Sequence, residues 1–494
     1  MASSDFEEYR ERIKLQLKIV GKALGEPDCR DGEHFPGIAI ACTEVDGYPR
    51  YVFQNCGIMV PDEYETVARN RVGARLDLRQ VNHDERRRDG GYQLLNVPLE
   101  LGAVKAVEAL REACGNHRAG TLNHIMSITP TDGGANLCPA AEPTPATAPE
   151  SVPESEFAWP PPTQHESGHR VRVRVIDTGL VPDAALLARW MEGVEGPPRL
   201  RPDESGVAPA LAELESADVA GRNLVDGAPP LPSQQPDYNV YYGHGTFIAG
   251  VIRCVAPDAD VWVANDFRQA GALTELRLIE ALQKLLDSPE PMPDIISLSA
   301  GGYFRSGCHL PALAEVLSAL RDRQRRDGRP VLVAAAGNDG RNEAFWPAAF
   351  HGVYSVGALR ERDLARACFS NYGDWVSLYA PGERLVNVFP AGTYAYYHGR
   401  VRECRYFEPP DARYYQHCTC VQPHDNEKAT FTGRARWSGT SFATPIVAGL
   451  IAQRMSRTGE NARDAAAWVR SHPTGSIEGL GDYVLPPGYT GNPD

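Results

Sequence analysis

The sequence predicts an α/β protein in which a parallel sheet carries helices on both faces, preceded by a small α+β domain. From residue 168 onward, short β-branched runs alternate with apolar patterns of helical period, which is typical of such a sheet. Residues 1–130 have a strand and helix pattern of their own, and a proline-rich stretch at 131–167 separates the two parts. A chain of 494 residues, 42% of them hydrophobic, is long enough for two domains.

The elements of residues 168–494 follow from their apolar patterns. The β-branched run Val171 to Ile176 predicts a strand, and Asp177 begins the turn that ends it. Further strands are expected over 261–264, 295–298 and 331–333. Two helices between them have apolar faces made of Leu276, Ile279 and Leu282, and of Leu313, Val316, Leu317 and Leu320.

A serine near the C-terminus stands at the start of another predicted helix. Gly439 permits a sharp turn, and the apolar run 446–452 then indicates a buried helix that carries Ser441 at its beginning. Pro445 is expected near the first turn, where its missing N–H costs little. The Ser441 amide would then be free to hold an oxyanion, although a plain serine cap of a core helix has the same pattern.

Three polar residues in distant parts of the chain also sit next to glycines. Asp177 ends a strand, at a place where open α/β sheets often carry their sites. His244 lies between two glycines and opens the apolar run 247–252, and Asn338 follows a strand and a glycine turn. Each of them alone also fits a turn acid, a helix-cap histidine or a turn asparagine.

Taken together, four motifs resemble the subtilisin-like serine proteases, or subtilases. They are Asp177-Thr178-Gly179, Gly243-His244-Gly245-Thr246, Ala335-Ala336-Gly337-Asn338 and Gly439-Thr440-Ser441-Phe442-Ala443-Thr444-Pro445. The order Asp, His, Ser is that of subtilisin. Further stretches at 255–259, 296–302, 354–358 and 379–382 look like family landmarks, so the resemblance spans about residues 168–470. A sedolisin-type relative would use a Glu and Asp pair instead.

The resemblance implies a subtilisin-like fold and a serine endopeptidase. Ser441 would be the nucleophile, His244 the base that takes its proton, and Asp177 the group that holds the imidazole. Asn338 and the Ser441 amide would form the oxyanion hole. No cofactor and no metal are expected, because the residues after Asp177, Asp183 included, lack clear calcium-ligand spacing.

In the family, the segments that match Ser299-Ala300-Gly301 and Ala335-Ala336-Gly337 border the substrate groove. Their small side chains would leave backbone edges that pair with an extended protein or peptide substrate. Close packing explains the same small residues equally well.

The N-terminal part has two interpretations. Strands are predicted at 37–42, 51–54, 92–98 and 122–129, with helices at 62–76 and 103–114. The later portion loosely resembles inhibitory prodomains of subtilases, ending near residues 122–126, so intramolecular inhibition is one expectation and a structural or partner-binding module the other. The linker 131–167 is expected to be extended, and either reaches the cleft or acts as a plain tether.

Composition and charge predict which partners and which cellular compartment the protein has. A net charge of −14 argues against a nucleic-acid partner, and no apolar run suggests a membrane span. Eleven scattered cysteines and the absence of a signal pattern at 1–25 favour the cytoplasm. An insertion at about 391–436 holds Cys404, Cys418, Cys420 and His424, which fit free thiols or a zinc site.

The insertion is expected to overhang the cleft, which favours a restricted intracellular processing protease. The second hypothesis is a catalytically silent subtilase fold that serves as a binding or regulatory module.

Overall fold

The computed structural model describes most of the chain. The described residues are 38–42, 49–73, 75–76, 91–98, 100–128, 142–148, 157–164, 168–181, 184–196, 241–267, 271–304, 310–361, 363–395 and 428–489. Residues 1–25, Asp183, and the cysteines and histidine of the insertion lie outside these ranges.

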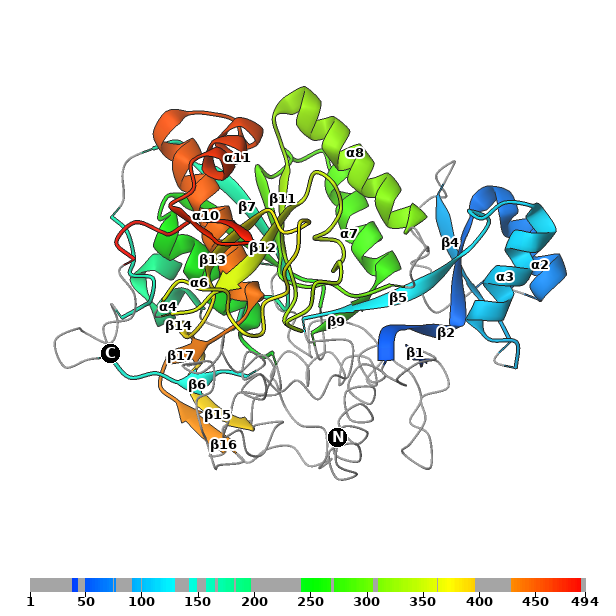
Figure 1. The fold of residues 1–494 in the computed structure, drawn as a ribbon, viewed down its shortest axis with the longest axis horizontal. Coiled ribbons are helices and arrows are strands. Elements are labelled where there is room, and N and C mark those ends of the chain that lie inside the picture. The colour runs from blue at the N-terminus through cyan, green and yellow to red at the C-terminus, as the bar shows by residue number, and fades with distance from the viewer. Residues whose placement is uncertain are drawn as a thin grey trace.

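An eight-stranded sheet forms the centre of the larger part of the molecule (Figure 1). Its strand order is β18-β19-β13-β12-β11-β10-β7-β8, and neighbours are parallel from β8 to β19. The strands are β7 (Val171–Asp177), β8 (Ala259–Asn265), β10 (Ile295–Leu298), β11 (Val331–Ala335), β12 (Tyr354–Leu359), β13 (Leu378–Pro381), β18 (Gly475–Ile477) and β19 (Gly481–Tyr483). Only β18 pairs in the antiparallel sense within this described sheet.

Helices cover both faces of this sheet. Helices α6 (His244–Val255) and α10 (Thr440–Thr458) pack against each other on one face, and α11 (Ala462–Ser471) follows α10. Helices α7 (Glu275–Asp287) and α8 (Pro311–Asp327) lie on the other side of the strands (Figure 1). Most of the first half of α10 is buried, as expected for a helix that is apolar on every face. The predicted α/β class is therefore confirmed.

The N-terminal module (described residues 38–128) is an antiparallel sheet with two helices on one face. Its strands are β1 (Ile38–Cys42), β2 (Pro49–Pro61), β3 (Arg75–Leu76), β4 (Tyr92–Asn96) and β5 (Thr121–Ser127), and its helices are α2 (Glu65–Val72) and α3 (Ala103–Cys114). Helix α2 is shorter than the predicted 62–76, because Gly73 takes a left-handed conformation with φ +64° and ends it.

The other face of this module lies on the larger part. Met59 and Leu94 of the module pack against Leu276 of α7 and Ala312 of α8. In addition, β5 pairs with β9 (Ala272–Thr274), so one strand of the larger part extends the module's sheet. The division of the chain into domains at residue 130 stays a prediction.

The described parts of the proline-rich linker are extended and bound to the protein surface. Strand β6 (Thr144–Pro145) pairs with β17 (Arg434–Trp437), which also pairs with β14 (Leu385–Val388). The Trp159 N–H donates to the Val386 carbonyl at 2.7 Å, and the reverse bond is 3.0 Å long. These described segments are therefore held in place by backbone pairing. Strands β15 (Gly392–Ala395) and β16 (Lys428–Phe431) pair at the two ends of the insertion.

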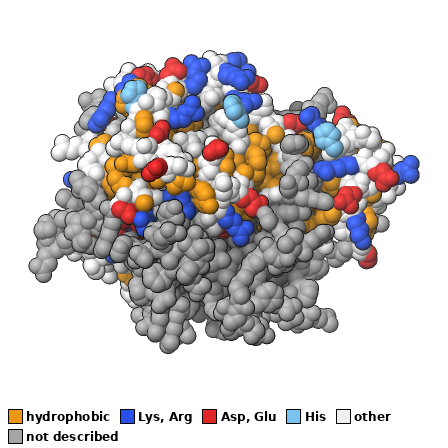
Figure 2. Space-filling view, in the orientation of Figure 1, with side chains coloured by type: hydrophobic (Ala, Val, Ile, Leu, Met, Phe, Trp, Pro, Cys, Tyr) orange, Lys and Arg blue, Asp and Glu red, His pale blue; other side chains and the backbone are white. Residues whose placement is uncertain are grey.

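The surface shows mixed charge on the face that is drawn. Basic and acidic side chains are interspersed over the upper helices and the N-terminal module, with an apolar band beside them (Figure 2). Among the described helices, none has the length and apolar character that a membrane crossing requires.

Candidate active site

Three neighbouring parallel strands deliver polar groups to one edge of the central sheet. Asp177 is the last residue of β7, Ser299 directly follows β10, and Asn338 follows β11 after a short turn. Because parallel strands share their carboxyl edge, these three residues meet there. The chain order also reverses here, since β8 lies on one side of β7 and β10 on the other. Such a switch point is the usual place for a site in an open α/β sheet.

Asp177 and His244 form a buried pair. The His244 Nδ1 atom lies 2.8 Å from Asp177 Oδ1 and 3.0 Å from Oδ2. The Thr178 amide donates to the same Oδ1 at 2.8 Å, which holds the carboxylate in place. Gly243 caps α6 with φ +81°, and a Cβ on Gly245 would meet Asp177 Oδ1 at 3.2 Å. The two glycines that flank His244 therefore make room for the pair, as the sequence suggested.

Aromatic side chains surround the imidazole. The rings of Trp437 and Phe442 lie 5.3 and 5.2 Å from the His244 ring, centroid to centroid, and Tyr241 lies at 6.1 Å. These rings exclude water from the Asp177–His244 pair, and in such a place its electrostatic attraction is stronger than in water. With its Nδ1 proton donated to Asp177, His244 has Nε2 available as a proton acceptor.

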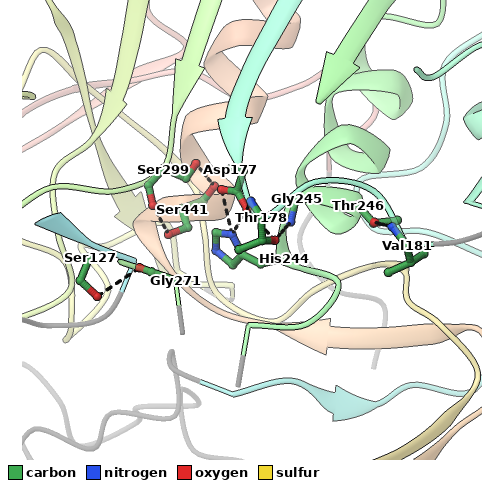
Figure 3. A network of polar contacts seen from close by, with 10 residues as sticks. All are labelled: Ser127, Asp177, Thr178, Val181, His244, Gly245, Thr246, Gly271, Ser299 and Ser441. Carbon is green, nitrogen blue, oxygen red and sulfur yellow. Dashed lines mark hydrogen bonds and ion pairs between the residues drawn. The ribbon is translucent and has the colours of Figure 1, made fainter. Parts of the chain in front are cut away.

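Ser441 is the second residue of α10 and lies in the same cluster (Figure 3). Its hydroxyl donates to the Ser299 carbonyl at 3.3 Å. No hydrogen bond joins Ser441 to His244, although both are described residues. The nucleophile candidate is thus present, with its hydroxyl directed to the residue that follows β10.

Pro445 lies deeper in the helix than the sequence analysis expected. Helix α10 begins at Thr440, so Pro445 stands in its interior rather than in its first turn. A residue with an N–H at this position would donate to the Ser441 carbonyl, four residues earlier. Instead, the Ser299 hydroxyl donates to that carbonyl at 2.9 Å. Ser299 therefore replaces the bond that the proline removes.

The amide of Asn338 has a fixed orientation. Its Oδ1 accepts from the Thr440 N–H at 2.8 Å and from the Thr440 hydroxyl at 2.9 Å. The Thr440 hydroxyl in turn accepts from the Gly337 N–H at 3.1 Å. These bonds direct the Asn338 NH₂ group away from Thr440. The Ser441 N–H lies in the first turn of α10, where amides have no partner within the helix, so the two groups are available donors.

A hollow of about 220 Å³ opens beside Ser441. Its lining consists of Ser127, Ile128, Ser299, Ala300, Ala335, Gly337, Asn338, Asp339, Phe345, Thr440 and Ser441. Four of the six predicted substrate-binding residues are among them. Gly301 instead pairs with Ser127 at the side of the hollow. Ala336 is directed into the core, where its N–H donates to Val356 O at 2.9 Å and its carbonyl accepts from Asn371 at 2.8 Å.

The end of β5 lies in this groove, a feature that the sequence analysis located only loosely. We define the β5 tail as Ile125 to Ile128. Ser127 N–H donates to Gly301 O at 2.8 Å, and Gly301 N–H returns a bond of 3.1 Å. On the opposite side, Ile128 N–H donates to Gly271 O at 2.8 Å, and the Ser127 hydroxyl donates to the same oxygen at 3.3 Å (Figure 3). The tail is therefore a middle strand between two segments of the larger part.

The groups that could ligate a metal ion, and the cysteine on α6, can be compared with the site among the described residues. No group of three or more His, Cys, Asp or Glu side chains in the described ranges is arranged to hold a metal ion. Cys254 lies on α6, beyond His244, and burial raises the pKa of its thiol to about 12. The thiol is therefore protonated at neutral pH and cannot compete as a nucleophile.

Comparison with known proteins identifies the family. A model of the subtilase family matches residues 168–471, which is more than half of the 494-residue chain. The chain belongs to the subtilase family. The matched range contains all four motifs on which the predicted resemblance was based, and it holds both edges of the groove in which the β5 tail of this subtilase lies.

Several bacterial proteases are similar to this subtilase. An intracellular serine protease of Paenibacillus polymyxa is 31% identical over 201 residues, 38% of this chain and 57% of that protein. A thermophilic serine proteinase of Bacillus sp. (strain AK1) is 29% identical over 206 residues, 40% of this chain and 46% of that protein. The matches thus span about half the length of these relatives. A solved lanthipeptide protease is 20% identical, with 65% of this chain and 86% of that chain covered and a TM-score of 0.40.

Proposed function

We propose that this subtilase is a serine endopeptidase in which Asp177, His244 and Ser441 form the catalytic triad. The observation that carries the proposal is the buried pair of Asp177 and His244, joined at 2.8 and 3.0 Å. The carboxylate holds the imidazole so that Nε2 accepts the Ser441 proton during attack on a peptide carbonyl. The imidazolium that results returns this proton to the leaving amine.

Asn338 and the Ser441 N–H form the proposed oxyanion hole. Thr440 binds the Asn338 oxygen at 2.8 and 2.9 Å, so the NH₂ group is left as the donor. Donors that are fixed before the reaction stabilise the negative charge of the tetrahedral intermediate without reorganisation.

We infer that the N-terminal module inhibits this site in the same chain. The β5 tail makes backbone bonds with Gly301 and Gly271, on the two sides of the groove. An extended substrate would pair with the same backbone groups by strand addition, so tail and substrate compete. The Ser441 hydroxyl rests on the Ser299 carbonyl in this state and turns toward His244 for attack.

The proposed role is restricted processing of a protein or peptide substrate in the cytoplasm. Occlusion of the groove by the β5 tail supports restriction, because a substrate must displace a paired strand. Cys114 and Cys254 of the described part are free thiols, as in reducing compartments, and one relative is named an intracellular serine protease.

A fluorophosphonate serine-hydrolase probe tests the triad on the full chain. The protein should be labelled at Ser441, and Ser441→Ala should stay unlabelled. Ser127→Pro removes the N–H that donates to Gly301, so it should raise the labelling rate about 10-fold, the effect of losing one or two backbone bonds. Ser127→Ala is the matched control, because it keeps the backbone pairing and should change the rate little.

Two results would contradict these proposals. Equal labelling of the unmutated protein and Ser441→Ala would remove Ser441 as the nucleophile. An unlabelled Ser127→Pro protein with a normal thermal unfolding transition would favour the silent binding module. If the protein is labelled at Ser441 but Ser127→Pro does not raise the labelling rate, the proposed triad is supported and the proposed inhibition by the β5 tail is rejected.

A further inference from the structure

A tyrosine three residues before His244 has a strained backbone and is not a member of the proposed triad. Tyr241 has φ +67°. In the described ranges, only two other residues besides glycines have a positive φ, namely Leu364 and Arg384. A bulky residue in this left-handed conformation is strained, and such strain persists only where the surrounding structure holds it, most often at functional sites. The conformation of Tyr241 therefore points to a role beyond core packing.

Both the backbone and the ring of Tyr241 are tied to the base. The Tyr241 carbonyl accepts from the His244 N–H at 3.0 Å, in the turn that leads into α6. Tyr241 is 4% exposed, and its ring lies 6.1 Å from the imidazole, centroid to centroid, with 85° between the two planes. The ring therefore has a fixed position beside His244.

The same ring lies over a glycine in the wall of the groove. Gly271 has φ +59°, and its carbonyl accepts from the Ile128 N–H at 2.8 Å. A Cβ on Gly271 would lie 2.9 Å from Tyr241 Cδ2 and 3.1 Å from Ile128 Cδ1. The Tyr241 ring and the Ile128 side chain thus fill the space that a side chain of residue 271 would need. Both residues belong to the apolar core of the larger part.

The register of the β5 tail gives the place of Ile128 in a substrate. Ser127 pairs with Gly301 in the antiparallel sense, so a residue two positions later in a bound strand lies opposite Ser299. The Ser299 carbonyl is the group that accepts from the Ser441 hydroxyl at 3.3 Å (Figure 3). The scissile bond of a substrate would then follow the residue opposite Ser299. A substrate that replaces the tail therefore places its second residue before the scissile bond where Ile128 lies.

We propose that Tyr241 selects substrates with a large apolar side chain at the second residue before the scissile bond. This inference rests on the proposed function, because it names the substrate class of the same site. The selected side chain takes the place of Ile128 and packs on the Tyr241 ring and the Gly271 backbone. Ile128 is 6% exposed, so a charged side chain at this place would lose its hydration, and a glycine would bury no apolar surface.

A library of peptides with randomised sequences tests the selection. Full-chain Ser127→Pro protein would digest the library, and mass spectrometry of the products would identify the residues around each cleaved bond. At the second residue before that bond, Ile, Leu, Val and Met should be at least about 10-fold enriched over Gly, Asp and Lys, because burial of a large apolar side chain contributes a factor of this size. Adding Tyr241→Ala, which keeps the Cβ and removes the ring, should reduce this ratio to less than about 3-fold and leave the preferences at other positions unchanged.

Three further variants separate the role of the ring from its contribution to stability. Tyr241→Phe retains the ring and should retain the preference. Tyr241→Trp enlarges the ring over Gly271 and should shift the preference from Ile to Ala, so it tests the inference even where Tyr241→Ala does not fold. Tyr354→Ala deletes a ring at the start of β12, at the amino edge of the central sheet, and should lower the thermal unfolding midpoint without changing the preference.

The inference is overturned if the Ser127→Pro protein shows no apolar enrichment at the second residue before the cleaved bond. It is also overturned if the Tyr241→Ala or Tyr241→Trp protein, labelled at Ser441 by the fluorophosphonate probe, keeps the parent preference. Failure to cleave any peptide by a protein that the probe labels at Ser441 has the same meaning. Failure to cleave together with no labelling rejects the proposed function itself.

Discussion

The two sides of the site differ in how complete they are. On the acid–base side, Asp177 and His244 are joined by two short contacts of 2.8 and 3.0 Å, and both are buried. On the nucleophile side, the Ser441 hydroxyl binds the Ser299 carbonyl at 3.3 Å and makes no bond to His244. In the proposed mechanism, the base is therefore assembled before a substrate arrives, while the nucleophile is not yet engaged.

The difference follows from which helices and strands contribute residues to each side of the site. The acid–base pair needs only β7 and the start of α6, which lie side by side in the core. The nucleophile side draws on α10, on the residues after β10 and β11, and on a groove that the β5 tail fills. In the proposed inhibition, this second side is the one that the N-terminal module acts on, because the β5 tail occupies its groove.

Removing the charge of the Asp177 carboxylate should have the largest effect on kcat. Asp177→Asn keeps the size of the side chain but can donate to His244 Nδ1, so the imidazole takes the wrong tautomer. We expect kcat on a peptide substrate to fall about 10⁴-fold with an unchanged thermal unfolding midpoint. The exposed Asp464→Asn on α11 is the control and should leave kcat unchanged. An Asp177→Asn enzyme with normal kcat would show that the buried pair is only structural.

Removal of the oxyanion donor should have the next largest effect. Asn338→Ala deletes the NH₂ group that Thr440 orients, and kcat should fall about 10²- to 10³-fold with little change in KM. Asn461→Ala, which removes the cap of α11, is a matched amide deletion far from the site and should not slow the reaction. A rise in KM with constant kcat would instead make Asn338 a substrate-binding residue.

Local patterns in the sequence predicted the acid–base side well. Glycines on both sides of His244 and a strand that ends at Asp177 are short-range signals, and the structure places these residues as expected. The bounds of α3 also match the predicted 103–114, since its apolar spacing is regular. Such features depend on neighbours in the chain, which a sequence displays directly.

Long-range pairing explains what the sequence did not reveal. Ser127 meets Gly301 and Gly271 only after two sheets are formed and docked, and no local pattern encodes this register. The hydrogen bonds between Asp339 and Tyr303 and between Tyr303 and Asn371 likewise join residues that lie far apart in the chain. One long-range feature did have a signal: a proline four residues after Ser441 leaves the Ser441 carbonyl without a helical partner. That gap required a donor, and Ser299 provides it.

The smallest expected effect concerns that donor. Ser299→Ala leaves the Ser441 carbonyl without its 2.9 Å bond, so the free energy of unfolding should fall by about 1–3 kcal/mol, measured as a lower thermal midpoint. Ser297→Ala is a matched control on β10: this hydroxyl is also buried but has no hydrogen-bond partner in the described structure, so its loss should not destabilise the protein. Equal midpoints for the two variants would mean that the hydrogen bond from Ser299 to the Ser441 carbonyl does not stabilise the folded protein. A lower midpoint for Ser299→Ala alone, with kcat reduced only a few-fold, would show that Ser299 supports helix α10 without taking part in the proposed acid–base chemistry.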